Sequence, residues 1–190
     1  DWSSDVILAA ILTISAVGTG LSLMLPLLSL ELERMGASAS LNGLNTAVAG
    51  LANILIAPMV PLLAARLGQR HLVLICLGGL VASILLFRLV PDLAAWFVFR
   101  FLFGLCIGTL FVLSEFWITV SAPDSRRGLI MGIYATILAL GFAAGPLVLG
   151  LVGTSGWAPY VCGALLVCAA VLPVVLLPRR LPEIGDAPHP

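Results

Sequence analysis

Long apolar runs separated by short polar connections divide this chain into six segments. Each run holds roughly 17–25 residues, the length that an α-helix needs to cross the hydrocarbon core of a membrane. The predicted spans are Val6–Leu30, Leu41–Leu63, Leu72–Val90, Leu93–Thr119, Gly128–Val152 and Trp157–Leu177. Backbone polar groups that face lipid have to be bonded within their own segment, so every span is predicted to be helical. We therefore expect an all-α membrane protein with one six-helix transmembrane bundle over residues 1–178.

The composition agrees with a membrane protein and argues against several other classes. Hydrophobic residues make up 61% of the chain and charged residues 9%, with a mean hydropathy of +1.19, whereas about a quarter of a soluble domain is charged. The chain has no lysine and no net charge, which argues against a nucleic-acid partner. Its four cysteines lie in apolar runs without a C-x-x-C pair, so we expect no metal site and no disulfide framework.

Arginines are distributed unevenly between the two sets of span ends, and this predicts the topology. One set holds only Arg34, and the other holds Arg66, Arg70, Arg126, Arg127, Arg179 and Arg180. The positive-inside rule places the richer set, and with it both termini, in the cytoplasm. Of the two arginines inside spans, Arg88 is close enough to the outer end of its span for its side chain to reach the membrane surface. Arg100 lies deeper.

Polar side chains form a stripe on each of the first two spans. Ser15, Thr19 and Ser22 recur at helical spacing on the first span, and Asn45 and Asn53 share roughly one face of the second. Such residues either join helices through hydrogen bonds or line a wet cavity. Because the two stripes belong to neighbouring helices, we favour a cavity. Its candidate lining residues are Ser15, Thr19, Ser22, Asn45, Asn53 and Trp117.

The fourth span carries the most informative pair of charges. Arg100, Gly104, Gly108, Phe111 and Glu115 fall on one side of this helix. Charged residues at membrane depth cost about 2.5–3.5 kcal/mol each on insertion scales, so a span that keeps two is expected to use them. At 1.5 Å per residue Arg100 and Glu115 lie about 22 Å apart, too far to pair with each other.

The two charges are suited to different roles. Arg100 keeps its proton in a protein and therefore acts as a fixed charge that attracts anions or biases a neighbouring acid. Glu115 can gain and lose a proton as its surroundings change, which proton coupling requires. The alternative is that Glu115 is an acid at a helix end, satisfied by Arg126, Arg127 or lipid headgroups.

An enzymatic function is not expected from this sequence. The motifs H-E-x-x-H and G-x-S-x-G are absent, and the two histidines, His71 and His189, lie in a loop and in the tail. We expect no catalytic residue and no cofactor.

The fifth span resembles a transporter signature. Gly132, Gly141, Gly145-Pro146 and Gly150 are similar to the motif G-x8-G-x3-G-P-x2-G-G of the antiporter branch of the major facilitator superfamily, and Leu149 departs from it. The glycines allow close helix packing and the proline bends the helix. The resemblance implies that these residues form a packing hinge that seals the site and favours exchange.

Two weaker similarities point to the same family. Arg100 with Gly104 resembles the fourth-helix motif R-x-x-q-G-x-g-a-a, in which the arginine is tied to proton transfer. The loop residues Arg66, Gly68 and Arg70 match the motif G-x-L-x-D-R-x-G-R-R between the second and third helices. Ala65 stands where that motif has an aspartate, which in the family belongs to a charge network that latches the two halves together.

This resemblance implies the N-terminal half of a twelve-helix transporter built from inverted three-helix repeats. Residues 179–190 then begin the central cytoplasmic loop, and a second six-helix half belongs to the same chain or to a second copy. The implied function is transport of a small molecule across a bacterial inner membrane by alternating access, with proton-coupled efflux as the favoured form. The proton gradient would supply the energy, and the apolar walls favour a lipophilic or neutral solute. Sugar-type symport, uniport and a non-transporting scaffold remain alternatives.

Overall fold

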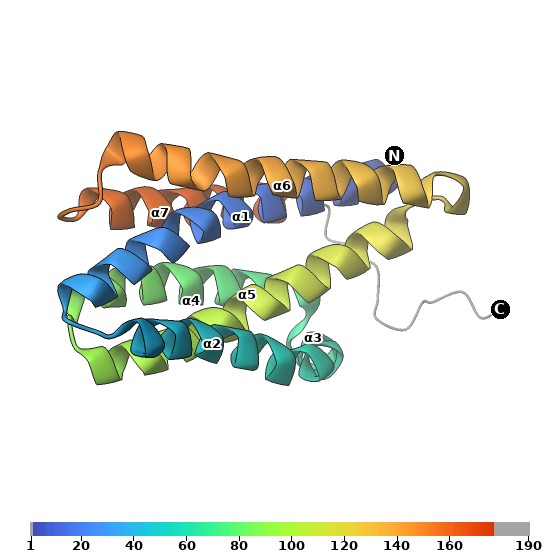
Figure 1. The fold of residues 1–190 in the computed structure, drawn as a ribbon. Coiled ribbons are helices and arrows are strands. Elements are labelled where there is room, and N and C mark those ends of the chain that lie inside the picture. Colours follow the sequence, from blue (N-terminus) through green and yellow to red (C-terminus); the bar gives the residue numbers. More distant parts are fainter. Residues whose placement is uncertain (1, 177–190) are drawn as a thin grey trace.

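The computed structural model describes residues 2–176, and in this range the chain forms helices and no strands (Figure 1). Six helical segments of the described range are long and apolar enough to cross a membrane. The prediction of an all-α protein with six transmembrane helices is therefore confirmed. The expected start of the central loop at 179–190, with Arg179 and Arg180, lies outside the described residues, as does the last residue of the sixth predicted span.

Four of the six spans are single helices. They are α1 (Trp2–Arg34), α4 (Gln69–Leu89), α5 (Leu93–Ser121) and α6 (Arg127–Val152), and α6 is preceded by the short turn η2 (Asp124–Arg126). With 33 residues, α1 is about 50 Å long, well beyond the roughly 30 Å of a hydrocarbon core. It therefore runs obliquely through the bundle, as Figure 1 shows.

The second and sixth spans are each interrupted near prolines: Pro58 and Pro61 in the second span, and Pro173 in the sixth. The second consists of α2 (Ala39–Ile56), the turn η1 (Ala57–Met59) and α3 (Val60–Leu67), and the sixth of α7 (Ala158–Ala169) and α8 (Val171–Leu176). Pro58, Pro61 and Pro173 each remove a backbone N–H and crowd the carbonyl four residues earlier, which breaks or bends a helix. Hydropathy does not register this effect, so it suggested uninterrupted spans over 41–63 and 157–177.

The helices are arranged with an internal two-fold pattern. α1 and α5 contact each other at the centre; α6 and α7 pack on α1, α2 and α4 pack on α5, and α4 contacts α7. The contacts of the first three spans with the last three are symmetric: if each of the first three spans changes places with its counterpart among the last three, the same pairs are in contact. The counterparts α1 and α5 run in opposite directions (Figure 1). The bundle thus consists of two inverted three-helix repeats, the arrangement that the family resemblance implies.

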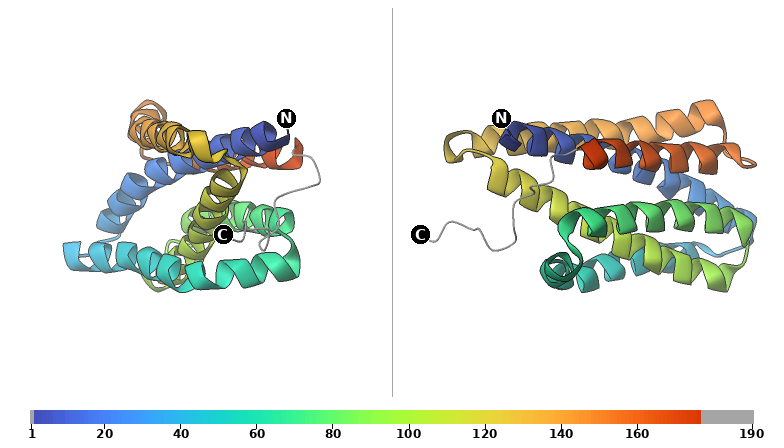
Figure 2. Two further views of the ribbon diagram at one scale, coloured as in Figure 1. Left: turned by 90° about the vertical axis from the view of Figure 1, so that its right-hand side faces the viewer. Right: turned by 180° about the vertical axis from the view of Figure 1, so that it is seen from behind.

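The two ends of the bundle differ in charge. α1 begins at the end that also holds α3 and the α5–α6 connection, with Arg66, Arg70, Arg126 and Arg127; we call this the basic end. The connections from α1 to α2, α4 to α5 and α6 to α7 lie at the other end, which we call the opposite end (Figure 2). The core is built largely from α1, α4 and α5, whereas α2 and α6 have the smallest buried share among the spans.

Candidate functional site

The stripe of α5 that holds both charges passes from the core to the surface. Arg100, Gly104 and Gly108 are buried, Phe111 is half-buried and Glu115 is exposed. α2 covers the first part of the stripe, whereas Glu115, further along the same helix, is exposed. The stripe therefore has a closed part around Arg100 and an open part at Glu115.

Arg100 is a buried cation without a counter-ion among the described residues. Its side chain is 1% exposed, and its Nε donates a hydrogen bond to Asn45 Oδ1 on α2 at 3.0 Å. Nη1 and Nη2 of Arg100 and Nδ2 of Asn45 are buried without a hydrogen-bond partner. The ion pairs found in residues 2–176 are Arg34–Glu31 and Arg127–Asp124. A buried charge without compensation costs several kcal/mol, so this arrangement is expensive to maintain.

The sequence places Arg100 and Asn45 opposite each other through a repeated close contact of α5 with α2. A β-carbon added at Gly104 would lie 2.5 Å from the Ala49 carbonyl oxygen, and one added at Gly108 would lie 2.5 Å from Asn53 Oδ1. The pairs Asn45/Arg100, Ala49/Gly104 and Asn53/Gly108 thus follow one another at four-residue steps on two parallel helices. Since only glycine fits this contact, Gly104 and Gly108 set the register that brings Asn45 to Arg100.

Glu115 has a neighbour that the sequence reasoning missed. Tyr134 of α6 is buried, its hydroxyl has no hydrogen-bond partner, and it interacts electrostatically with the Glu115 carboxylate. Arg127, considered above as a partner for Glu115, pairs with Asp124 at 2.6 Å instead. A phenolic hydroxyl in a largely apolar helix was the signal available in the sequence, since such a group needs a partner when buried.

The polar stripe of α1 lies against α6. Ser22 Oγ donates to the Gly141 carbonyl at 3.2 Å and to the Thr19 carbonyl at 3.1 Å, and Thr19 Oγ1 donates to the Ser15 carbonyl at 2.8 Å. Gly141 and Gly145 of α6 are buried in this contact. In this conformation the hydroxyl of Ser22 joins α1 to α6, whereas the hydroxyl of Thr19 bonds to a carbonyl of its own helix.

The other residues of the proposed packing hinge lie away from that contact. A β-carbon at Gly132 or Gly150 would have no atom within 4 Å, and Pro146 is exposed on α6. The motif therefore divides into two glycines that pack against α1 and two at which a side chain would meet open space.

The loop motif at the basic end lies between α3 and α4 and bonds to α5 and α8. Gly68 has φ +80°, a backbone conformation that favours glycine, and lets α4 start directly after α3. Arg70 then donates to the Val175 carbonyl of α8 at 2.7 Å, while Arg66 is exposed. Gln69, a departure from the family motif, accepts a hydrogen bond from Trp117 Nε1 of α5. Trp117 is 1% exposed, so in this conformation its indole belongs to the core.

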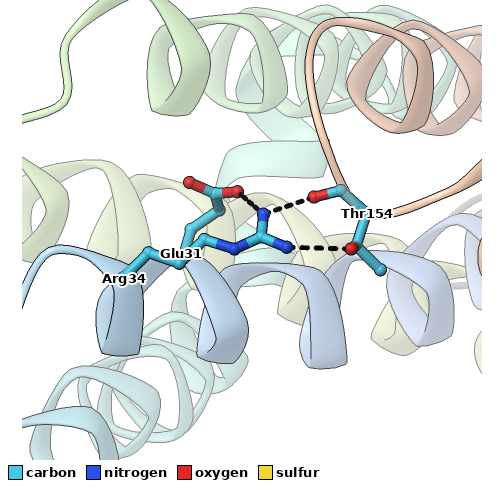
Figure 3. A network of polar contacts seen from close by, with 3 residues as sticks. All are labelled: Glu31, Arg34 and Thr154. Atoms are coloured by element: carbon cyan, nitrogen blue, oxygen red, sulfur yellow. Dashed lines mark hydrogen bonds and ion pairs between the residues drawn. The ribbon is translucent and has the colours of Figure 1, made fainter.

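A second polar cluster, which the sequence did not predict, joins the end of α1 to the α6–α7 connection at the opposite end. Arg34 at the end of α1 pairs with Glu31 and donates to the Thr154 carbonyl at 2.6 Å and to Thr154 Oγ1 at 2.9 Å (Figure 3). Nearby, the guanidinium carbon of Arg88 lies 5.5 Å from the centroid of the Trp157 ring. Arg88, which was expected to reach the membrane surface from the outer end of its span, stacks on an aromatic ring at that end of the bundle.

Comparison with known proteins identifies the family. The model of the Major Facilitator Superfamily matches residues 8–189. The chain belongs to this superfamily. It is also 29% identical over 179 residues to a Bacillus subtilis (strain 168) protein described as the uncharacterized MFS-type transporter YfkF, covering 94% of this chain and 45% of that relative. The chain thus spans less than half the length of this relative, consistent with the N-terminal half of a major-facilitator fold.

Proposed function

We propose that this six-helix bundle is the N-terminal half of a secondary transporter that exports a small molecule in exchange for protons. Membership of a transporter superfamily supports transport in general. The observation that carries the proton-coupled form is the placement of Glu115 and Arg100 on one stripe of α5: an exposed carboxylate in a spanning helix and a buried fixed charge.

In this proposal Glu115 carries the proton. Glu115 is exposed on α5, where water can reach its carboxylate in one conformation and a closing second half can remove that water in another. A carboxyl group that alternates between wet and dry surroundings binds and releases a proton in turn. Arg100 biases this cycle through its fixed charge, and the α1–α6 contact at Gly141 and Gly145 acts as the hinge.

The proposed setting is a bacterial inner membrane with both termini in the cytoplasm. The arginine excess at the basic end supports this orientation, since positive residues favour the cytoplasmic side. A second six-helix half, from the same polypeptide or from a second copy, would cover the open face of α5 and complete the path for the substrate. The mass of the native polypeptide distinguishes these two sources.

The alternatives are symport or uniport on the same fold and a scaffold without transport. The experiment that separates them uses the full native protein reconstituted into vesicles with an imposed pH gradient, reported by a pH-sensitive dye. A panel of lipophilic cations, neutral molecules and carboxylates is added in turn. Exchange predicts that a substrate dissipates the gradient when it moves against the proton. Co-transport predicts the opposite direction, uniport no change in pH, and a scaffold no substrate flux.

A further inference from the structure

Three buried nitrogen atoms between α2 and α5 have hydrogen atoms to donate and no acceptor among the described residues. They are Nη1 and Nη2 of Arg100 and Nδ2 of Asn45. Their side chains are joined by the Nε–Oδ1 hydrogen bond of 3.0 Å and are 1% and 0% exposed. The cluster therefore offers donors only, with one net positive charge.

The chemistry of the missing acceptor follows from this geometry. The planar guanidinium presents parallel N–H groups that match the two oxygens of a carboxylate, and the Asn45 amide adds a further donor beside them. Arg88, the other arginine within the spans, stacks on Trp157 at the opposite end, so the cluster has a single positive charge to neutralise. One positive charge is balanced by a monovalent anion, which favours a carboxylate over a doubly charged phosphate.

We propose that Arg100 and Asn45 form a binding site for the carboxylate of a transported organic anion. The inference rests on the proposed transport function and narrows its substrate to a lipophilic carboxylate, whose apolar body suits the surrounding helices. Because α2 packs closely against α5 at Gly104 and Gly108, the carboxylate reaches the donors only when this contact opens. Binding is therefore tied to a conformational change of the bundle.

A binding experiment tests this site without requiring transport. The full native protein in detergent is unfolded by heat near neutral pH with increasing benzoate, and with benzamide as the uncharged analogue at equal ionic strength. Benzoate is expected to raise the unfolding temperature saturably by about 2 °C or more, and benzamide is not. The variant R100Q should lose the response, and R100K should keep little of it, because an ammonium cannot make the paired contact.

An internal carboxylate provides the sharper test. Asn45→Asp places an acid beside Arg100 in nearly the same volume, so it should raise the unfolding temperature and abolish the benzoate response. The matched control is Asn53→Asp, which puts the same charge opposite Gly108, where no arginine lies; it should lower the unfolding temperature and keep the response.

Two results would overturn the proposal: benzoate acting no more strongly than benzamide on the parent protein, or an unchanged benzoate response in Asn45→Asp. If R100Q fails to fold, Asn45→Asp and R100K still decide the question. If the protein binds benzoate through these residues but exchanges no protons, the carboxylate site is supported and the proton-coupled function is refuted. A failure of the site and a failure of the proposed function can therefore be distinguished.

Discussion

Gly145 of α6 and Ser22 of α1 meet so closely that a β-carbon on Gly145 would lie 1.9 Å from Ser22 Oγ and 2.5 Å from the Leu23 backbone nitrogen. Because part of this contact is backbone, no side-chain rotation relieves it. Gly145→Ala should therefore force α1 and α6 apart and destabilise the protein by about 1–3 kcal/mol, the usual cost of overpacking. Thermal unfolding of the purified protein measures this loss.

Gly132→Ala is the matched control on the same helix. A β-carbon there meets no atom within 4 Å, and alanine is a better helix former than glycine by about 1 kcal/mol. Gly132→Ala should leave stability unchanged or raise it slightly. Equal losses in the two variants would show that the glycines act through flexibility of α6 and not through contact with α1.

The bond between Gln69 and Trp117 predicts a stability loss at the basic end. Gln69→Leu removes the acceptor of the buried Trp117 N–H, and an unpaired buried donor costs about 1–3 kcal/mol. Gln69→Glu retains a carbonyl-type oxygen and should lose much less. The unfolding temperatures of the two variants check this, and a loss from Gln69→Glu as large as from Gln69→Leu would contradict the role given to the acceptor.

The Arg34–Thr154 contact predicts a local effect at the opposite end. Arg34 is 45% exposed, and exposed ion pairs contribute at most about 1 kcal/mol, so Arg34→Ala should change overall stability little. It should instead raise amide hydrogen exchange in the α6–α7 connection, residues 153–156. Thr154→Val, which keeps the carbonyl acceptor, should give a smaller increase. Unchanged exchange in Arg34→Ala would mean that the connection is held by other contacts.

The spans and the stripe on α5 could be predicted from the sequence because hydropathy and helical periodicity are local properties. The four-residue spacing of Arg100, Gly104 and Gly108 was visible in the sequence. Asn45 and Asn53 are eight residues apart, the same separation as between Arg100 and Gly108. Their pairing was not, since the register between two helices depends on which glycine-sized gaps meet in the folded bundle.

The surroundings of Glu115 and of the glycines in α6 could not be predicted from the sequence for a related reason. Hydropathy identifies a spanning helix but not the face that its neighbours cover, so the exposure of Glu115 and the open space around Gly132 and Gly150 could not be read from it. The Gln69–Trp117 bond joins residues 48 positions apart, so no local pattern in the sequence predicts it.

Proton coupling through Glu115 is the central claim, and Glu115→Gln tests it most directly. Glutamine keeps the size and hydrogen-bonding capacity of the side chain but cannot release a proton. The measurement compares, in inverted membrane vesicles containing the full native protein, uptake driven by a pH gradient with substrate exchange at equal pH. Glu115→Gln should abolish the first and spare the second. Gradient-driven uptake as fast in the variant as in the parent protein would contradict the account.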